Sequence, residues 1–408
     1  MISFQRVHLW LRLSLFSLFV VAFFGVLMRY KIGFEFPYFN QKNIQHGHSH
    51  FAFAGWITQT LMVLMMAFME RNLPTKNIKH YIPWLFGNLL CAYIMLVSFF
   101  VQGYGLFSIT FSTISIFIYY RFAYLFLRDL NKISAHHPSK NWFKAGLWFG
   151  IISTLGTFAL AYMMASKQVH QHLYLSSVYF YLHFQYNGWF FFACMGLFMA
   201  SMHELKASMP QNKFIFSLFG VACLPAYFLS ILWAFIPIWL YIIVIIASFA
   251  QAIAWILFIR MIMRNIFIFR INFSFISNII FILIAFSVTI KLSLQLASTI
   301  PSISQLAFGF RPIVIAYLHL VFLAITSAFL VNYMFAYHYF KNSKPAIISM
   351  IVFIVGVFLN ELALGIQGIG ALYYILIPHI NEVLFYISVF ILLGCLMLFI
   401  FSKKEKSI

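Results

Sequence analysis

The chain has 408 residues, of which 64% are hydrophobic, 21% are aromatic and only 8% are charged. Its formal net charge at pH 7 is +19, and its mean hydropathy is +0.95. A soluble domain of this length needs far more polar residues to cover its surface. The composition therefore excludes a soluble domain and indicates a protein with many membrane spans.

Apolar runs of about 20 residues, the length of a transmembrane helix, recur along the whole sequence. Cutting the sequence at its polar breaks predicts twelve spans, near residues 9–28, 49–69, 81–102, 105–127, 144–166, 176–202, 214–235, 237–262, 271–296, 312–337, 346–368 and 379–402. No linker separates them, so we expect a single all-α membrane domain covering residues 1–408.

The basic residues are unevenly distributed between the two ends of these spans. With the N-terminus on the cytoplasmic side, 20 of the 26 Lys and Arg residues fall on that side and 6 on the other. This bias follows the positive-inside rule and predicts that both termini are cytoplasmic. The net charge is then explained by topology and by attraction to the lipid bilayer, so nucleic acid is not an expected partner.

A nine-residue motif recurs at intervals of four spans. It appears as HSHFAFAGW from His48, YLHFQYNGW from Tyr181 and YLHLVFLAI from Tyr317. Its third residue is His50, His183 or His319, and the intervals between these histidines are 133 and 136 residues. The repeat predicts three four-helix arcs with approximate threefold symmetry, at about residues 1–128, 129–265 and 266–402.

The chemistry of the repeated histidines points to a ligand role. Ionisable side chains at membrane depth generally serve a function, and neutral imidazole is the commonest metal ligand in proteins. Spans 2, 6 and 10 run in the same direction, which puts the three histidines at similar depth near the outer face. We therefore expect at least two of them to bind a metal, although any single one could be a satisfied core residue.

In span number and histidine placement, the sequence resembles the catalytic subunit of the haem-copper oxidase superfamily, nearest its nitric-oxide-reductase branch. The resemblance implies a low-spin haem b held by histidines of spans 2 and 10, in a bacterial plasma membrane. The family's tenth span carries His-x-His, and here Tyr317-Leu318-His319 keeps only the second histidine. Tyr317 is then either a phenolate ligand to a second haem or an ordinary hydrogen-bonding tyrosine.

The histidine that the resemblance requires on span 2 is matched by His50 or His48. Residues two apart on a helix differ by about 200°, so His48 and His50 cannot face the same haem. His46 and His50 do share a face if the helix begins that early. Because the repeat favours His50, we expect His50 and His319 to form a bis-imidazole pair.

The second metal site of that family is only partly preserved. His183 and Gly188 match the reductase pattern His-x-x-x-Glu-Gly, but Asn187 stands where the glutamate should be. Gln185 stands at the place of an oxidase glutamate, and residues 214–235 contain no histidine. Since a divalent metal needs three or more ligands, the usual binuclear centre is not encoded at its usual places.

Charged residues near the outer face are further candidates. Glu361 and Glu382 are the only carboxylates inside the predicted spans. They are candidate proton relays, ligands together with His183 or His379, or structural partners of residues such as Asn360. Arg311 and Lys291 are candidates to neutralise haem propionates. The full candidate set is Glu361, Tyr317 and Asn187 as catalytic residues, His50, His319, His48 and Arg311 as haem contacts, and His50, His319 and His183 as metal ligands.

These features predict electron transfer through a low-spin haem b to a remodelled site that reduces nitric oxide or dioxygen. That site would hold a second haem, or non-haem iron or copper. No c-type C-x-x-C-H motif occurs, so a separate cytochrome c or a quinol would donate electrons, with an accessory subunit as a further expected partner. The alternatives are a non-catalytic sensor of nitric oxide or haem, an electron shuttle of the same fold, and a transporter of haem or metal that uses His46, His48 and His50.

Overall fold

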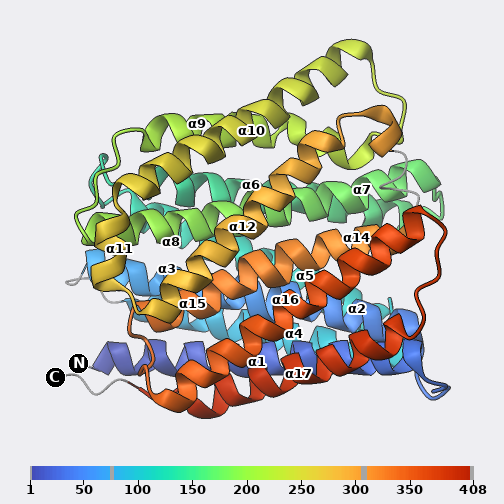
Figure 1. Cartoon of the computed structure of the whole chain (residues 1–408), viewed down its shortest axis with the longest axis horizontal. Coiled ribbons are helices and arrows are strands. Elements are labelled where there is room, and N and C mark those ends of the chain that lie inside the picture. The colour runs from blue at the N-terminus through green and yellow to red at the C-terminus, as the bar shows by residue number, and fades with distance from the viewer. Residues whose placement is uncertain (1, 74–77, 305–309, 405–408) are drawn as a thin grey trace. The chain divides into compact units, whose positions relative to one another are not determined.

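The computed structural model describes residues 2–73, 78–304 and 310–404, and every regular element within them is a helix (Figure 1). Ten helical stretches among these residues are long and apolar enough to cross a membrane: Val7–Gly33, Gln41–Asn72, Ile78–Gln102, Leu106–Leu130, Lys140–Ala165, Ile238–Arg264, Phe275–Ala297, Arg311–Ala336, Lys344–Leu372 and Ile380–Phe401. The protein is therefore an all-helical, multi-pass membrane protein, as the composition predicts.

Two of the twelve predicted spans differ from simple membrane helices. The span expected at 214–235 is a pair of short helices, α9 (Asn212–Cys223) and η4 (Pro225–Ile231), bent by 44°. The span expected at 176–202 is a continuous helical run of α7 (Gln171–His183), η3 (Phe184–Phe190) and α8 (Phe191–Glu204), which is not among the ten. The structure thus supports ten or eleven spans in the part it describes, and the count of twelve and the three arcs stay predictions.

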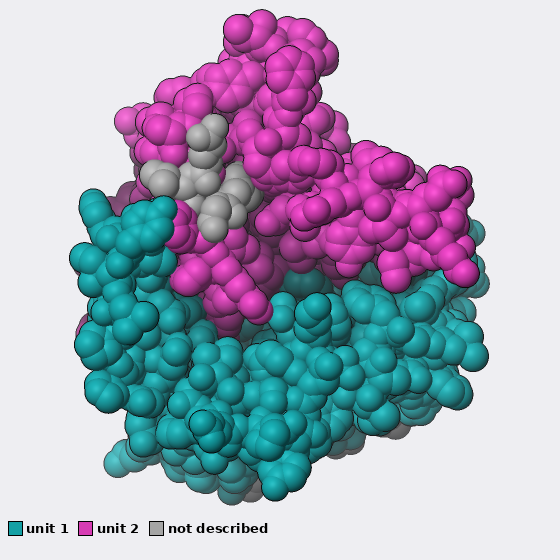
Figure 2. All heavy atoms as spheres, turned by 90° about the vertical axis from the view of Figure 1, so that its right-hand side faces the viewer, with its two compact units in different colours: residues 1–133, 279–281, 327–408 teal, residues 134–278, 282–326 magenta. Residues whose placement is uncertain are grey.

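The chain divides into two compact units, which are coloured separately in Figure 2. Unit 1 comprises Met1–Ile133, Ile279–Phe281 and Ser327–Ile408, and unit 2 comprises Ser134–Asn278 and Ile282–Thr326. These boundaries do not follow the three predicted repeats, because unit 1 combines the first repeat with the end of the third.

Unit 1 is built mainly from long helices that pack along their neighbours. Contacts join α1 to α2, η1 and α17, join α2 and α5 to α4, and join α16 to α17. Its helices are α1 (Ile2–Gly33), α2 (Gln41–Phe51), η1 (Ala52–Thr58), α3 (Gln59–Asn72), η2 (Ile78–Tyr81), α4 (Ile82–Gln102), α5 (Leu106–Leu130), α15 (Ala328–Ala336), α16 (Lys344–Leu372) and α17 (Ile380–Phe401).

Unit 2 is organised around the run α7–η3–α8, which packs against α6. Besides α7, η3, α8, α9 and η4, it contains α6 (Lys140–Ala165), α10 (Ile238–Arg264), α11 (Ile266–Asn272), most of α12 (Phe275–Ala297), α14 (Arg311–His319) and nearly all of η5 (Leu320–Ser327). Trp142 shows how these helices are joined, since its indole N–H donates to Asn212 Oδ1 at 2.9 Å and connects α6 to α9.

The three copies of the histidine motif share a local structure as well as a sequence. In each copy an α-helix passes into a π-helix just after the histidine: η1 begins two residues after His50, while η3 and η5 begin directly after His183 and His319. Beyond the π-helix, each span is almost entirely buried. π-Helices are rare and often occur at functional sites, so the structure gives independent support to the repeat.

Candidate functional site

The π-helical turns after the repeated histidines are supported by side chains that bond their carbonyls. Asn88 of α4 donates its amide N–H to the Ala54 carbonyl at 3.0 Å, and the Cys223 thiol lies 3.7 Å from the Asn187 carbonyl. Thr326 donates to the Val321 carbonyl at 2.8 Å within its own helix. Ala54 and Asn187 both lie four residues beyond their histidine, and their partners come from the following span. Backbone carbonyls inside a membrane need such donors because lipid supplies none.

His48 faces α1 and has one ring nitrogen engaged by the backbone. Its Nδ1 lies 3.1 Å from the Val21 carbonyl, so the proton belongs on Nδ1 and the lone pair on Nε2. Helix α1 comes close at this point, since a Cβ atom on Gly25 would lie 3.5 Å from His48 Cε1. The Nε2 atom makes no hydrogen bond to the residues that the structure describes. This is the arrangement expected of an imidazole that ligates a metal through Nε2.

His50 lies on the opposite side of the helix, against α4 and the loop that follows it. Its ring stacks on Phe99, with ring centroids 4.3 Å apart, and its Nε2 lies 3.2 Å from the Tyr104 hydroxyl. His46 packs on the same tyrosine, with centroids 4.7 Å apart. The expectation that His46 and His50 share a face from which His48 points away is therefore confirmed. His50 does not show the arrangement expected of a haem ligand, because its Nε2 already bonds Tyr104.

His319, in unit 2, resembles His48 in its hydrogen bonding. Its Nδ1 lies 2.9 Å from the carbonyl of Ile315, one turn earlier in α14. The bond places the proton on Nδ1 and the lone pair on Nε2, and it fixes the orientation of the ring. Of the three repeated histidines, His319 is the one that bonds a backbone carbonyl through Nδ1.

His183 is held by the protein through both ring nitrogens. It is 1% exposed, its Nε2 lies 2.9 Å from the Cys223 carbonyl, and its Nδ1 accepts from the Asn187 amide at 3.1 Å. Cys223 ends α9 just before Pro225, which lacks an N–H group and breaks the helix. His183 thus caps a carbonyl at this break. The geometry supports a structural role for His183, since neither ring nitrogen is left for a metal ion.

Several other polar residues of unit 2 interact with His183 or with its neighbours in the chain. The Oδ1 atom of Asn187 is buried without a hydrogen-bond partner, and Lys291 of α12 is 8% exposed and interacts electrostatically with His183 and Cys223. The hydroxyl of Tyr186 hydrogen-bonds with Tyr317. This bond favours the ordinary hydrogen-bonding role for Tyr317 over a phenolate ligand.

The carboxylates expected near the outer face belong to unit 1. Glu361 of α16 accepts a hydrogen bond from the Asn360 amide at 3.2 Å and interacts electrostatically with Arg29 of α1. Arg29 also interacts with His48, so α1, α2 and α16 bring an imidazole, a guanidinium and a carboxylate together within unit 1. From the sequence, Arg29 was predicted only to contribute to topology, although its position at the end of the first predicted span was a usable signal.

Two other candidate residues lie apart from these groups. Glu382 pairs with His379 at the exposed start of α17, where His379 has a left-handed backbone conformation with φ of 57°. Arg311 is exposed at the start of α14. Glu382 therefore pairs with its neighbour His379, and Arg311 lies at the surface of unit 2.

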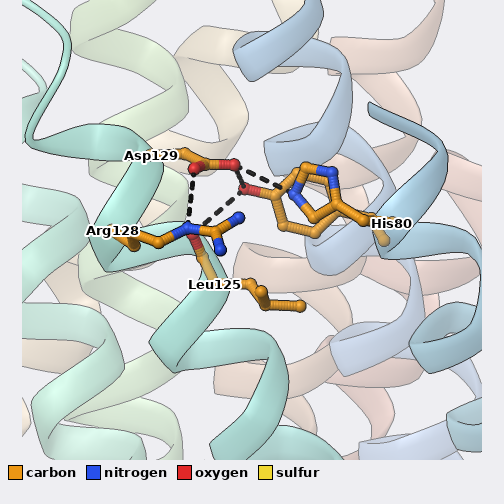
Figure 3. A network of polar contacts seen from close by, with 5 residues as sticks. His80, Leu125, Arg128 and Asp129 are labelled. Carbon is orange, nitrogen blue, oxygen red and sulfur yellow. Dashed lines mark hydrogen bonds and ion pairs between the residues drawn. The ribbon is translucent and has the colours of Figure 1, made fainter. Parts of the chain in front are cut away.

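A buried carboxylate that the span prediction missed lies at the other end of unit 1. Asp129 is fully buried at the end of α5, where it receives hydrogen bonds from Tyr81 at 2.9 Å and Arg128 Nε at 3.2 Å and lies 3.0 Å from His80 Nε2 (Figure 3). These contacts join α5 to η2, the short helix that precedes α4. The predicted span ended at residue 127, two positions too early to include Asp129. The tyrosine and arginine bonds satisfy a carboxylate that would otherwise be costly to bury.

No family model matches this sequence, and no curated protein matches it either. Among the described side chains, no group of three or more His, Cys, Asp or Glu residues is arranged to hold a metal ion. His48 and His319 each present Nδ1 to a backbone carbonyl, as metal-binding imidazoles commonly do. The second metal site of the resembled family is not matched, because both nitrogens of His183 are engaged and Asn187 replaces its acidic neighbour.

Proposed function

We propose that this chain is a membrane haem protein that transfers electrons through a low-spin haem b, with His48 and His319 as axial ligands. One observation carries the proposal: both imidazoles present Nδ1 to a backbone carbonyl, at 3.1 and 2.9 Å. Histidines that ligate metals usually donate their other ring N–H in this way. The pairing of spans 2 and 10 itself comes from the sequence repeat and the resemblance.

The choice of His48 over His50 refines the expectation from the sequence. Alignment of the repeat favours His50, but its Nε2 is bonded to Tyr104 and its ring is stacked on Phe99. His48 lies two residues earlier in the same helix, on the face that packs against α1. Its neighbour Arg29 adds a positive charge, which would favour a carboxylate group of a haem on that side.

A haem b held by two histidines would supply one-electron transfer. In this proposal the carbonyls of Val21 and Ile315 orient the two imidazoles that would hold it. A separate cytochrome c or quinol donates the electrons. The proposed function is electron transfer without reduction of nitric oxide or dioxygen, because the residues around His183 do not fit a second metal.

The test is a haem analysis of the full-length protein, produced with a haem supply and purified in detergent. A pyridine haemochrome assay, scaled to protein concentration, gives the haem type and the number of haems per chain. We expect about one haem b per chain, with the absorbance spectrum of a six-coordinate low-spin iron that does not change when carbon monoxide is added to the reduced protein.

Two results would contradict this proposal. Purified protein that takes up no haem would rule out the haem function. A reduced protein that binds carbon monoxide stoichiometrically and consumes nitric oxide or dioxygen with a reductant would restore the catalytic alternative with a second, open site.

A further inference from the structure

The face of α2 opposite His48 carries a second pair of imidazoles that the proposed haem site does not use. His46 and His50 are one helical turn apart, and residues at this spacing point the same way. Two histidines four residues apart on one helix face hold zinc in metalloproteases. Neither ring nitrogen of His46 makes a hydrogen bond to the described residues, and the His46 ring is only half-buried.

Tyr104 places its hydroxyl oxygen beside His50. Its hydroxyl lies 3.2 Å from His50 Nε2, and its ring lies 4.7 Å from that of His46. Metal–ligand bonds of about 2.0–2.2 Å put neighbouring ligand atoms roughly 3 Å apart, so this spacing suits a shared metal ion as well as a hydrogen bond. The two imidazoles and the phenol ring therefore lie on the same side of α2, with Tyr104 in contact with both histidines.

The loop that carries Tyr104 is held in a defined conformation. Gly103 ends α4 with φ of +66°, and a Cβ atom there would lie 2.7 Å from Asn43 Oδ1 of α2, so only glycine fits. Ser108 Oγ accepts from the Gly105 N–H and donates to the Gly103 carbonyl, each at 2.8 Å. The Phe99 ring stacks on the His50 ring. A site whose ligands are fixed by such contacts needs little rearrangement to bind a metal.

We propose that His46, His50 and Tyr104 form a binding site for a divalent transition-metal ion. Two imidazole nitrogens and a phenolate oxygen suit Cu²⁺ and Zn²⁺, with Cu²⁺ bound more tightly, and water completes the coordination. Three protein ligands with an open position are typical of a site that exchanges its metal. Lys42, one turn before His46, is exposed, so its charge is screened by solvent. The site does not depend on the proposed haem, since His48 points to α1.

The test is a Cu²⁺ titration of the full-length protein, purified with a tag that contains no histidine and stripped with a chelator. We expect one site per chain, weakened about tenfold or more by His46→Ala or His50→Ala. Tyr104→Phe preserves the ring packing, so it should fold normally, retain weaker Cu²⁺ binding and lose the phenolate-to-copper absorption band. His48→Ala, on the other face of the helix, is the matched control and should bind Cu²⁺ as the wild type does.

The inference is overturned if His46→Ala and His50→Ala together leave Cu²⁺ affinity unchanged, if Tyr104→Phe keeps the charge-transfer band, or if His48→Ala removes the binding. Haem content measured on the same samples separates this proposal from the previous one. A variant that loses haem but still binds Cu²⁺ tests only the proposed haem function. A variant that keeps haem but no longer binds Cu²⁺ tests only the proposed metal site.

Discussion

An imidazole in a membrane helix is defined by which of its two nitrogens the protein engages. His48 and His319 bond backbone carbonyls through Nδ1, whereas His183 bonds the protein through both nitrogens. Histidines that look alike in the sequence motifs therefore have different chemistry in the structure. The difference depends on partners such as Val21 and Cys223, which lie 27 and 40 residues away along the chain.

At the inner side predicted for unit 2, His137 provides a pH-dependent contribution to stability. It lies in the loop before α6, bonds Ser139 Oγ through Nδ1 at 2.8 Å, and packs edge-on against His203. Burial lowers its pKa from 6.5 to about 4, with help from the nearby charges of His203 and Lys140. As the pH is lowered, His137 becomes protonated near pH 6.5 in the unfolded chain but only near pH 4 in the folded protein. The free energy of unfolding should therefore decrease as the pH drops from about 6.5 to 4.

The measurement is the thermal unfolding midpoint of detergent-solubilised protein at several pH values in this range. His137→Asn should make the midpoint less dependent on pH, because the titrating ring is removed while a polar side chain remains. The exposed neighbour His136 offers a control, and His136→Asn should leave the wild-type pH dependence in place. Equal pH dependence in wild type and His137→Asn would contradict the assignment.

At the scale of elements, the π-helical turns are the feature that sequence periodicity did not reveal. The motif predicted where the histidines would recur, but the extra residue in each π turn depends on side chains that donate hydrogen bonds to its carbonyls. Asn88 is one of these: it is 2% exposed and bonds both the Ala54 carbonyl and Gln59 Oε1. In the same way, the broken span at Pro225 was predicted as one straight span, because its residues are uniformly apolar.

Replacing Asn88 by Ala should therefore destabilise unit 1. The substitution leaves the Ala54 carbonyl without this donor in an apolar environment, at a cost of about 1–3 kcal/mol. Ser98→Ala on the same helix is the control, since Ser98 only bonds the Ile94 carbonyl of its own helix and its loss should cost little. The thermal unfolding midpoint of each variant measures the effect, and a larger loss for Ser98→Ala than for Asn88→Ala would refute it.

At the scale of the whole molecule, composition alone predicted a multi-pass helical membrane protein, and the structure confirms this. The predicted boundaries also hold for most spans, because runs of apolar residues and their polar breaks are visible in sequence. The span around His183 is harder to recognise, since Gln185 and Asn187 lower its hydropathy. Those two side chains bond Ser153 and His183 inside the protein, and only the folded structure reveals such partners.

The division into two units was not visible in the sequence either. The repeat suggested three similar parts, whereas the packing places the first four predicted spans with the last two in unit 1. This grouping matters for function, because it brings α1, α2 and α16 together around His48, Arg29 and Glu361. Contacts between helices so distant in sequence cannot be derived from local periodicity.

The most direct test of the proposed axial ligation compares the haem content of His48→Ala and His50→Ala with that of the wild type. If His48 is the axial ligand on span 2, His48→Ala loses most of its haem and its low-spin spectrum, while His50→Ala keeps both. If His48→Ala instead retains a full complement of low-spin haem, His48 does not ligate the iron and the assignment made here is wrong.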